Sequence, residues 1–167
     1  MAKFLKNNAG TITEEATVGT SSGSGDASKI AHLDANGRFD QSFMPTGIGA
    51  DTKVITASEA LSAGDFVNIH NSTGAKARKA DASVSGKEAH GFVKAAVANG
   101  ANATVYFEGA NDQVTGQTPG PVFLSATTPG AATSTAPSGS GQVVQRIGFA
   151  VATTEINFQS QPPIVLA

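Results

Sequence analysis

The chain has 167 residues, of which 40% are hydrophobic and 14% are charged, and its formal net charge is -2. This length is enough for one domain of ordinary size plus an arm. The lysines and arginines form no cluster or basic stripe, which argues against a nucleic-acid partner. Cysteine is absent, so the sequence excludes disulfides and thiolate metal sites.

The sequence carries no signal for membrane insertion or export. No apolar run approaches the roughly 18 residues that a membrane helix requires. The opening segment Met1–Gly10 holds too few apolar residues for the central region of a signal peptide. We therefore expect a soluble protein that is made in the cytoplasm and has no membrane partner.

Residues 1–29 are predicted to form an extended N-terminal arm. Its larger apolar residues are few, namely Phe4, Leu5, Ile12 and Val18. The run Thr20–Gly25 has the composition of a flexible linker. Such a segment cannot bury enough apolar surface to offset the entropy of ordering it. We therefore expect the arm to be disordered in the free chain and ordered on a partner.

Residues 30–50 are predicted to form a hairpin or connector. Asn36-Gly37 is a strong signal for a two-residue turn, because both central positions of such a turn need positive φ. Pro45 then ends any regular pairing. The large apolar residues of this segment are Ile30, Leu33, Phe39, Phe43 and Met44. So many in a short segment are expected to dock on the domain or on another subunit, with Phe39 and Phe43 as candidate anchors.

Residues 51–167 are predicted to form a compact all-β domain, a barrel or a jelly-roll-like sandwich. Turn signals recur about every 8–12 residues, which is typical of such folds. Strands are expected over residues 54–55, 66–70, 89–97, 103–108, 122–124 and 143–151, with a break at Thr153-Thr154 and a return strand that holds Ile156 and Phe158. An edge strand is expected over 75–82, which its basic residues would protect. Residues 57–61 are expected to form one short helical turn.

The central strand of this domain is predicted within Gly141–Phe158. Period-two alternation assigns to its core face Val143, Gln145, Ile147, Phe149 and Val151. Gly148 lies within this strand, and a glycine at such a position usually marks a bulge, a bend or the close approach of another backbone.

Signals for catalysis or metal binding are weak. His32, His70 and His90 have no partner at metal-ligand spacing on the same element. Asp34–Gly37 resembles the start of a calcium loop, but its glycine is misplaced and the required Glu is missing, so a turn explains it better. Nucleophile-elbow and phosphate-loop patterns are absent from the sequence. We expect no enzymatic activity, no metal and no cofactor.

Several segments resemble proteins of tailed-bacteriophage virions. Lys29–Pro45, KIAHLDANGRFDQSFMP, looks like a segment common in phage fibres and head proteins. The segments similar to capsid decoration (cement) proteins are Gly47–Asp51, Ala63–Ile69, Pro119–Gly130 and Gln145–Gly148. The likeness extends over most of the chain but leaves out the opening arm.

The resemblance implies a virion protein that is made in the host cytoplasm and lies on the outer capsid surface. It would bind the major capsid protein, clamp neighbouring capsomers and form a homo-oligomer, for which we expect a trimer ahead of a dimer. The residues predicted to contact the capsid or another subunit are Phe4, Leu5, Ile12, Val18, Ile30, Leu33, Phe39, Phe43 and Met44.

The alternative is a fibre or receptor-binding module that contacts host-surface glycans, because the Asp34–Pro45 segment also occurs in fibres. The absence of Trp and the single Tyr place it second. A depolymerising enzyme is a distant third.

Overall fold

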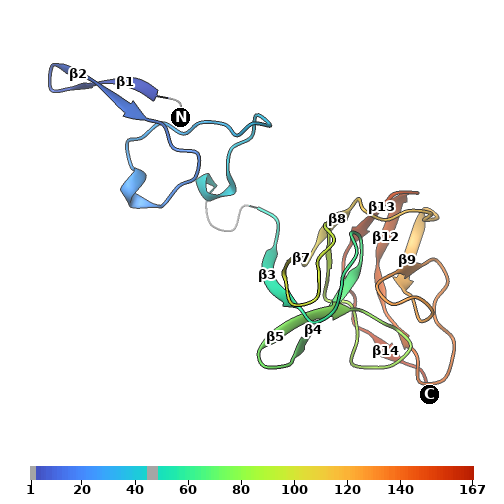
Figure 1. The fold of residues 1–167 in the computed structure, drawn as a ribbon. Coiled ribbons are helices and arrows are strands. Elements are labelled where there is room, and N and C mark those ends of the chain that lie inside the picture. The colour runs from blue at the N-terminus through green and yellow to red at the C-terminus, as the bar shows by residue number, and fades with distance from the viewer. Residues whose placement is uncertain (1–2, 45–48) are drawn as a thin grey trace. The chain divides into compact units, whose positions relative to one another are not determined.

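The chain forms two units in the computed structural model, Met1–Gly49 and Ala50–Ala167, and the structure describes residues 3–44 and 49–167 (Figure 1). In these ranges the only helical segments are two short 3-10 turns, η1 (Ser24–Asp26) and η2 (Gln41–Phe43), so the all-β prediction is confirmed. The predicted arm, 1–29, and the predicted connector, 30–50, lie in the same unit except for Ala50, which begins the second unit.

The first unit begins with a β-hairpin where an extended arm was predicted. Strand β1 (Lys3–Asn8) pairs antiparallel with β2 (Thr11–Ala16). Ala9 and Gly10 form the turn, with φ values of 51° and 92°. Two positive φ values give the turn a twist that matches the twist of the paired strands. An alanine is not a turn signal, so the sequence did not reveal this hairpin.

Residues 17–44 continue the first unit as loops with the two 3-10 turns. The backbone N–H of Val18 donates to Ile30 and its carbonyl accepts from His32, both at 3.0 Å. The turn at Asn36-Gly37 is present, but only Gly37 has positive φ, at 73°. In the described part of residues 30–50 no strand pair flanks the turn, so of the two predicted forms, hairpin or connector, the hairpin is wrong.

Five strands of the second unit close into a barrel in the order β3-β5-β4-β6-β7, with β3 and β5 parallel and the other neighbours antiparallel. They are β3 (Thr52–Ala57), β4 (Phe66–Asn71), β5 (Ala75–Lys79), β6 (Gly91–Val93) and β7 (Asn102–Tyr106). Closure places β5 between two strands, so the edge strand predicted over 75–82 is wrong. Residues 57–61 are not helical, and Leu61 instead makes a bridge to Val97.

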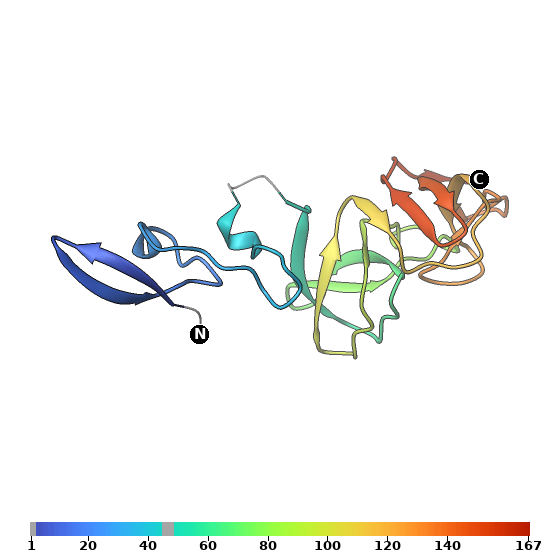
Figure 2. The same cartoon turned by 90° about the horizontal axis from the view of Figure 1, so that it is seen from above.

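An antiparallel sheet of five strands, in the order β10-β9-β12-β13-β8, follows the barrel (Figure 2). Its strands are β8 (Gly109–Asn111), β9 (Gly120–Leu124), β10 (Ala132–Thr133), β12 (Arg146–Ala152) and β13 (Glu155–Phe158). A separate short pair joins β11 (Val143–Val144) to β14 (Ile164–Val165). The second unit was predicted to be a barrel or a sandwich. In the structure it is a closed barrel with an open sheet attached to it.

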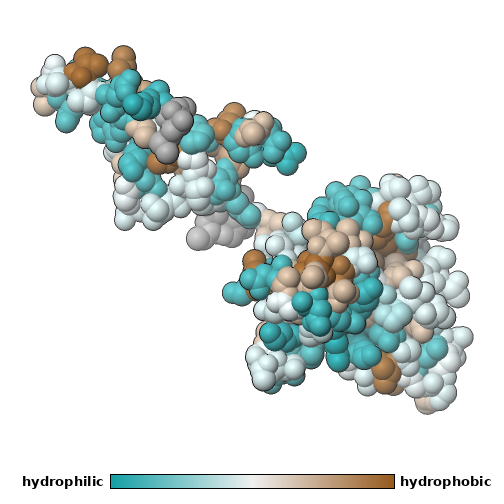
Figure 3. All heavy atoms as spheres, viewed as in Figure 1, coloured by the Kyte–Doolittle hydropathy of each residue, from teal (hydrophilic) through white to brown (hydrophobic). Residues whose placement is uncertain are grey.

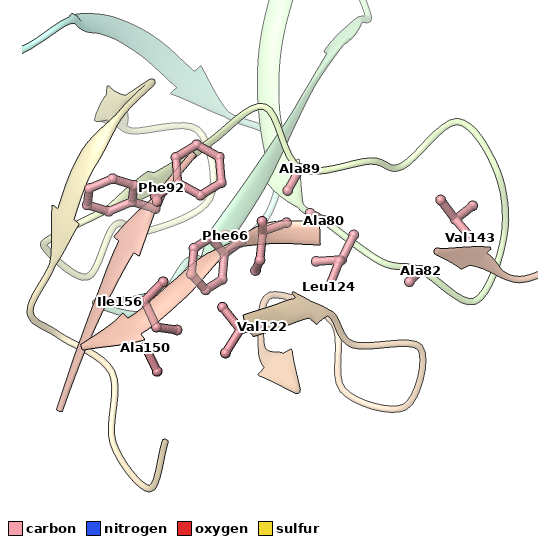
Figure 4. Packing of buried hydrophobic residues seen from close by; sticks show 12 residues of the cluster. Phe66, Ala80, Ala82, Ala89, Phe92, Val122, Leu124, Val143, Ala150 and Ile156 are labelled. Carbon is pink, nitrogen blue, oxygen red and sulfur yellow. The ribbon is translucent and has the colours of Figure 1, made fainter. Parts of the chain in front are cut away.

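The main core of the second unit lies between barrel and sheet (Figure 4). Phe66 and Phe92 come from barrel strands, and Phe158 comes from the sheet. The ring centroid of Phe158 lies 5.6 Å from that of Phe66 and 5.7 Å from that of Phe92. A smaller cluster fills the barrel itself and includes Val67, the neighbour of Phe66 on β4. Successive side chains along β4 point to opposite faces of the strand, so β4 contributes residues to both cores.

Gln145 is one of four buried polar residues of the second unit. Its Oε1 accepts a hydrogen bond from the Ala89 N–H at 2.7 Å, and its Nε2 donates to the Ala89 carbonyl at 2.9 Å. Nε2 also donates to the Ser160 hydroxyl at 3.0 Å. These bonds satisfy the buried amide and attach the loop around Ala89 to the C-terminal segment.

The predicted core face of the central strand is correct only as far as Ile147. Val143, Gln145 and Ile147 are buried, but Phe149 and Val151 are 43% and 56% exposed. The register shifts between Arg146 and Gly148, where φ is 142° and a side chain would collide with the Asn157 carbonyl. This bulge moves the following residues to the opposite face of the sheet.

Candidate binding surface of the first unit

None of the residues of the first unit that the structure describes is buried. Its large apolar side chains are nevertheless numerous, and hydrophobic atoms lie among hydrophilic ones on its surface (Figure 3). Six of them are at least two-fifths exposed: Leu5, Ile12, Ile30, Leu33, Phe39 and Met44. A unit with exposed apolar groups and no buried residue has little hydrophobic stabilisation of its own.

The hairpin gathers two of the predicted interface residues on one face. Leu5 lies opposite Glu14, and Ile12 lies opposite Asn7, so Leu5 and Ile12 share a face as diagonal neighbours. They are 72% and 61% exposed. Lys3 and Glu14 pair on the same face at 2.7 Å between Nζ and Oε2.

The opposite face of the hairpin is less apolar. Phe4 is partly buried there. Beside it, Lys6 Nζ lies 3.1 Å from Glu15 Oε2. Exposed ion pairs of this kind contribute about 0.2–1 kcal/mol each. They favour the hairpin register but cannot replace a core.

The hairpin sheet contains only β1 and β2 within the described residues, so both strands are edges. Edge strands present unpaired N–H and C=O groups and can pair with a strand of another chain. A two-stranded hairpin alone is also marginally stable in water. The hairpin therefore combines an apolar face with two open edges, both suited to partner contact.

A second group of apolar residues surrounds η2. The rings of Phe39 and Phe43 meet edge to face, with centroids 6.1 Å apart. The Asp40 carboxylate accepts from the Ser42 N–H at 2.9 Å and caps the turn. The Ser42 hydroxyl accepts from the Ser21 N–H at 2.7 Å and links the two loops. Polar bonds, rather than apolar burial, hold this group together.

Aspartates order the loops of the first unit. Asp34 accepts from the backbone N–H groups of Arg38 and Asn36, at 2.9 and 2.8 Å, and these bonds lower its pKa. The Ser42 hydroxyl and N–H lower the pKa of Asp40. Hydrogen bonds from Ser22 and Lys29 likewise depress the pKa of Asp26. In all three aspartates these bonds favour the ionised carboxylate.

The structure thus brings together two pairs of the predicted interface residues, Leu5 with Ile12 and Phe39 with Phe43. Phe4 lies on the other face of the hairpin. Val18 is half-buried and forms the bridge to Ala31. The other three predicted residues, Ile30, Leu33 and Met44, lie at exposed positions in loops.

The three histidines lie on separate elements. His70 Nε2 is 2.9 Å from the Ser58 hydroxyl, and burial followed by the nearby Arg78 charge lowers the His70 pKa. His90 Nδ1 accepts from the Ile69 N–H at 2.9 Å. His32 packs beside Gly19. Across the described ranges, no three His, Asp or Glu side chains gather as metal ligands would.

The sequence did not indicate a groove of about 470 Å³ on the second unit. Pairing of β3 with β7 brings Asp51 beside Glu108, and Lys94 Nζ lies over the partly buried Tyr106 ring at 5.6 Å from its centroid. The contributing residues are far apart in the chain. Their only sequence signal is the alternation along each strand, which does not reveal which strands are neighbours.

Comparison with protein-family models, curated proteins and solved structures yields no match to this chain. Where the structure describes the chain, it contains no helix with the length and hydrophobicity needed to span a bilayer.

Proposed function

We propose that the protein is a capsid decoration protein of a tailed bacteriophage. It binds the outer surface of the head through its first unit and clamps neighbouring subunits of the major capsid protein. The protein acts as a homo-oligomer, a trimer in preference to a dimer, and catalyses no reaction. The partner class comes from the resemblance of Lys29–Pro45 and the later segments to phage virion proteins.

One structural observation carries the proposal: the first unit exposes its large apolar side chains and buries none of its described residues. Full burial of such a side chain contributes about 1.5–3 kcal/mol, so a half-exposed one retains about 1 kcal/mol for a partner. Strand addition at a hairpin edge would supply further main-chain hydrogen bonds. Binding to a partner would therefore stabilise the first unit, by burying its apolar side chains and by pairing its strand edges.

A capsid suits this mode of binding because it repeats the same site many times. Contacts from linked subunits add as avidity, so each contact can be modest. A ligand that binds the assembled shell better than separated subunits stabilises the shell by mass action. A clamp with a weakly stable first unit and a firmly folded second unit meets both conditions.

The test uses capsids stripped of this protein and the full-length chain. The double variant Leu5→Glu with Ile12→Glu should lose about 30-fold in affinity per site, the equivalent of about 2 kcal/mol. Re-addition of the wild-type chain should raise the temperature at which the capsids rupture, and the double variant should not at equal concentration.

Val84→Glu is the matched control, because Val84 is an exposed apolar residue of the second unit. It should bind capsids as the wild type does. Equal binding of all three chains, or no effect of the wild-type chain on capsid rupture, would contradict the proposed function.

A further inference from the structure

Two asparagines of the chain are followed by glycine, Asn36 in the first unit and Asn99 in the second. Both dipeptides lie in exposed turns. In such a dipeptide the main-chain nitrogen of the glycine can attack the side-chain amide carbon of the asparagine and close a five-membered ring. Glycine hinders this attack least, because it has no Cβ. The two sites therefore have the same local chemistry, and the surrounding structure determines which of them reacts faster.

The site in the second unit is held by a strand outside its own turn. The N–H of Gly100, which carries the attacking nitrogen, donates to the Ala57 carbonyl at 2.9 Å. The Ala57 N–H donates to the Ala101 carbonyl at 2.8 Å. Ala57 is the last residue of β3 and is 1% exposed. The Gly100 nitrogen is therefore released only when the turn detaches from a barrel strand, and openings at core strands are the most costly in a fold.

The site in the first unit is held by bonds within its own turn. The Gly37 N–H donates to the Asp34 carbonyl at 3.0 Å. The Asp34 Oδ1 accepts from the N–H groups of Asn36 and Arg38, at 2.8 and 2.9 Å. None of the described residues of this unit is buried, so these local bonds are not reinforced by a core. Exposed turns of this kind open at a low cost in free energy.

We propose that Asn36 is a site of spontaneous deamidation and that the Asp34 bonds limit its rate. When the turn opens, the Gly37 nitrogen loses its proton to solvent and bonds to the Asn36 Cγ. The Cγ–Nδ2 bond breaks, and ammonia leaves after taking up a proton, so that a succinimide remains. Water then breaks either bond between the ring nitrogen and a ring carbonyl carbon. Breaking the bond to Cγ gives aspartate, and breaking the bond to the main-chain carbonyl carbon gives isoaspartate.

Both products disturb the turn. Each puts a negative charge at position 36, whose N–H bonds to the Asp34 carboxylate. Two like charges this close repel each other. Isoaspartate also lengthens the main chain by one carbon between Asp34 and Arg38, which the carboxylate of Asp34 links. The reaction therefore changes the charge and the order of the loop that carries Leu33 and Phe39.

The experiment ages the full-length chain in a mildly alkaline buffer and follows both sites by peptide mass spectrometry that distinguishes asparagine, aspartate and isoaspartate. Asn36 should convert at least about tenfold faster than Asn99 in the same sample, because its turn opens more readily. In denaturant the two sites should convert at similar rates, since the structure no longer separates them. Amide exchange should show lost protection at Arg38 in the aged chain. The variant Asn36→Gln, which forms the ring far more slowly, should keep that protection.

Asp34→Ala should accelerate the conversion of Asn36 by a few-fold and leave Asn99 unchanged. Asp40→Ala is the matched control, since Asp40 caps η2 and accepts from Ser42; it should convert like the wild type. The proposal is overturned if Asn36 stays intact, if the two asparagines convert equally in the native chain, or if their difference persists in denaturant. Equal rates in Asp34→Ala and the wild type would also overturn it.

Discussion

The two units of this protein are built in opposite ways. The second unit buries twenty hydrophobic residues in two clusters, and the residues described in the first unit bury none. Apolar burial is the dominant favourable term in folding. The second unit therefore has a hydrophobic core of its own, whereas the described part of the first unit is held by hydrogen bonds and ion pairs. The comparison separates the part of the chain that has a hydrophobic core from the part for which we propose a binding role.

The largest effect should come from removing an aromatic ring from the second unit. Phe66→Ala leaves a cavity against Phe92 and Phe158 and should lower the free energy of unfolding by about 3–5 kcal/mol. Phe39→Ala, the same change in the first unit, should shift it by less than about 0.5 kcal/mol, because Phe39 is 53% exposed. Denaturant unfolding of the full chain measures both. Equal losses would mean that the two units share one core.

Gln145→Ala should have the next largest effect. It removes the acceptor of the Ala89 N–H and one of the two donors to the Ala89 carbonyl, which also accepts from the Ser160 hydroxyl at 3.1 Å. A buried group left without a partner costs about 1–3 kcal/mol, so a loss of about 1–3 kcal/mol is expected from the Ala89 N–H. Gln142→Ala, at a half-buried position nearby, is the control and should cost about 1 kcal/mol or less. A loss below 1 kcal/mol for Gln145→Ala would show that the loop around Ala89 is held by other contacts.

A smaller change should stabilise the hairpin of the first unit. Ala9 has a φ of 51°, a region that glycine adopts without steric strain. Ala9→Gly should slow amide hydrogen exchange in β1 and β2 by a few-fold, with no change in the unfolding of the second unit. Ala16→Gly places the same residue in an ordinary strand position and should speed exchange. Faster exchange in both variants would argue against the turn geometry described above.

The smallest effect concerns pH. Because hydrogen bonds depress the pKa of Asp34 below its ordinary value of 3.8, its contribution is present above that value and is lost as pH falls through the lower, folded pKa. Amide exchange at Asn36 and Arg38, corrected for its intrinsic pH dependence, should therefore lose protection on acidification. Asp34→Asn should remove this dependence, whereas unchanged protection at low pH in the wild type would show that the carboxylate does not order the turn.

The parts predicted correctly from sequence are those that depend on neighbours in the chain. The strand expected over 66–70 is β4, and the strand expected over 122–124 lies within β9. The all-β class follows from the same local signals. These features need only alternation and turn residues, which a single sequence contains.

The parts that were missed depend on contacts between distant residues. The bulge at Gly148 reverses the exposure of Phe149 and Val151, although the glycine itself was recognised as a break. Barrel closure turned a predicted edge strand into an internal one. Of the candidate interface, the sequence identified the apolar residues of the first unit. Their pairing and the groove depend on strand register, which alternation alone does not determine.

The central claim is that the first unit is stabilised by its partner. Amide hydrogen exchange of the full chain, free and bound to capsids, tests it most directly. The account predicts fast exchange over residues 3–44 in the free protein, slow exchange over the second unit, and strong protection of β1 and β2 on the capsid. Protection of the hairpin in the free protein, or fast exchange that persists on the capsid, would contradict the claim.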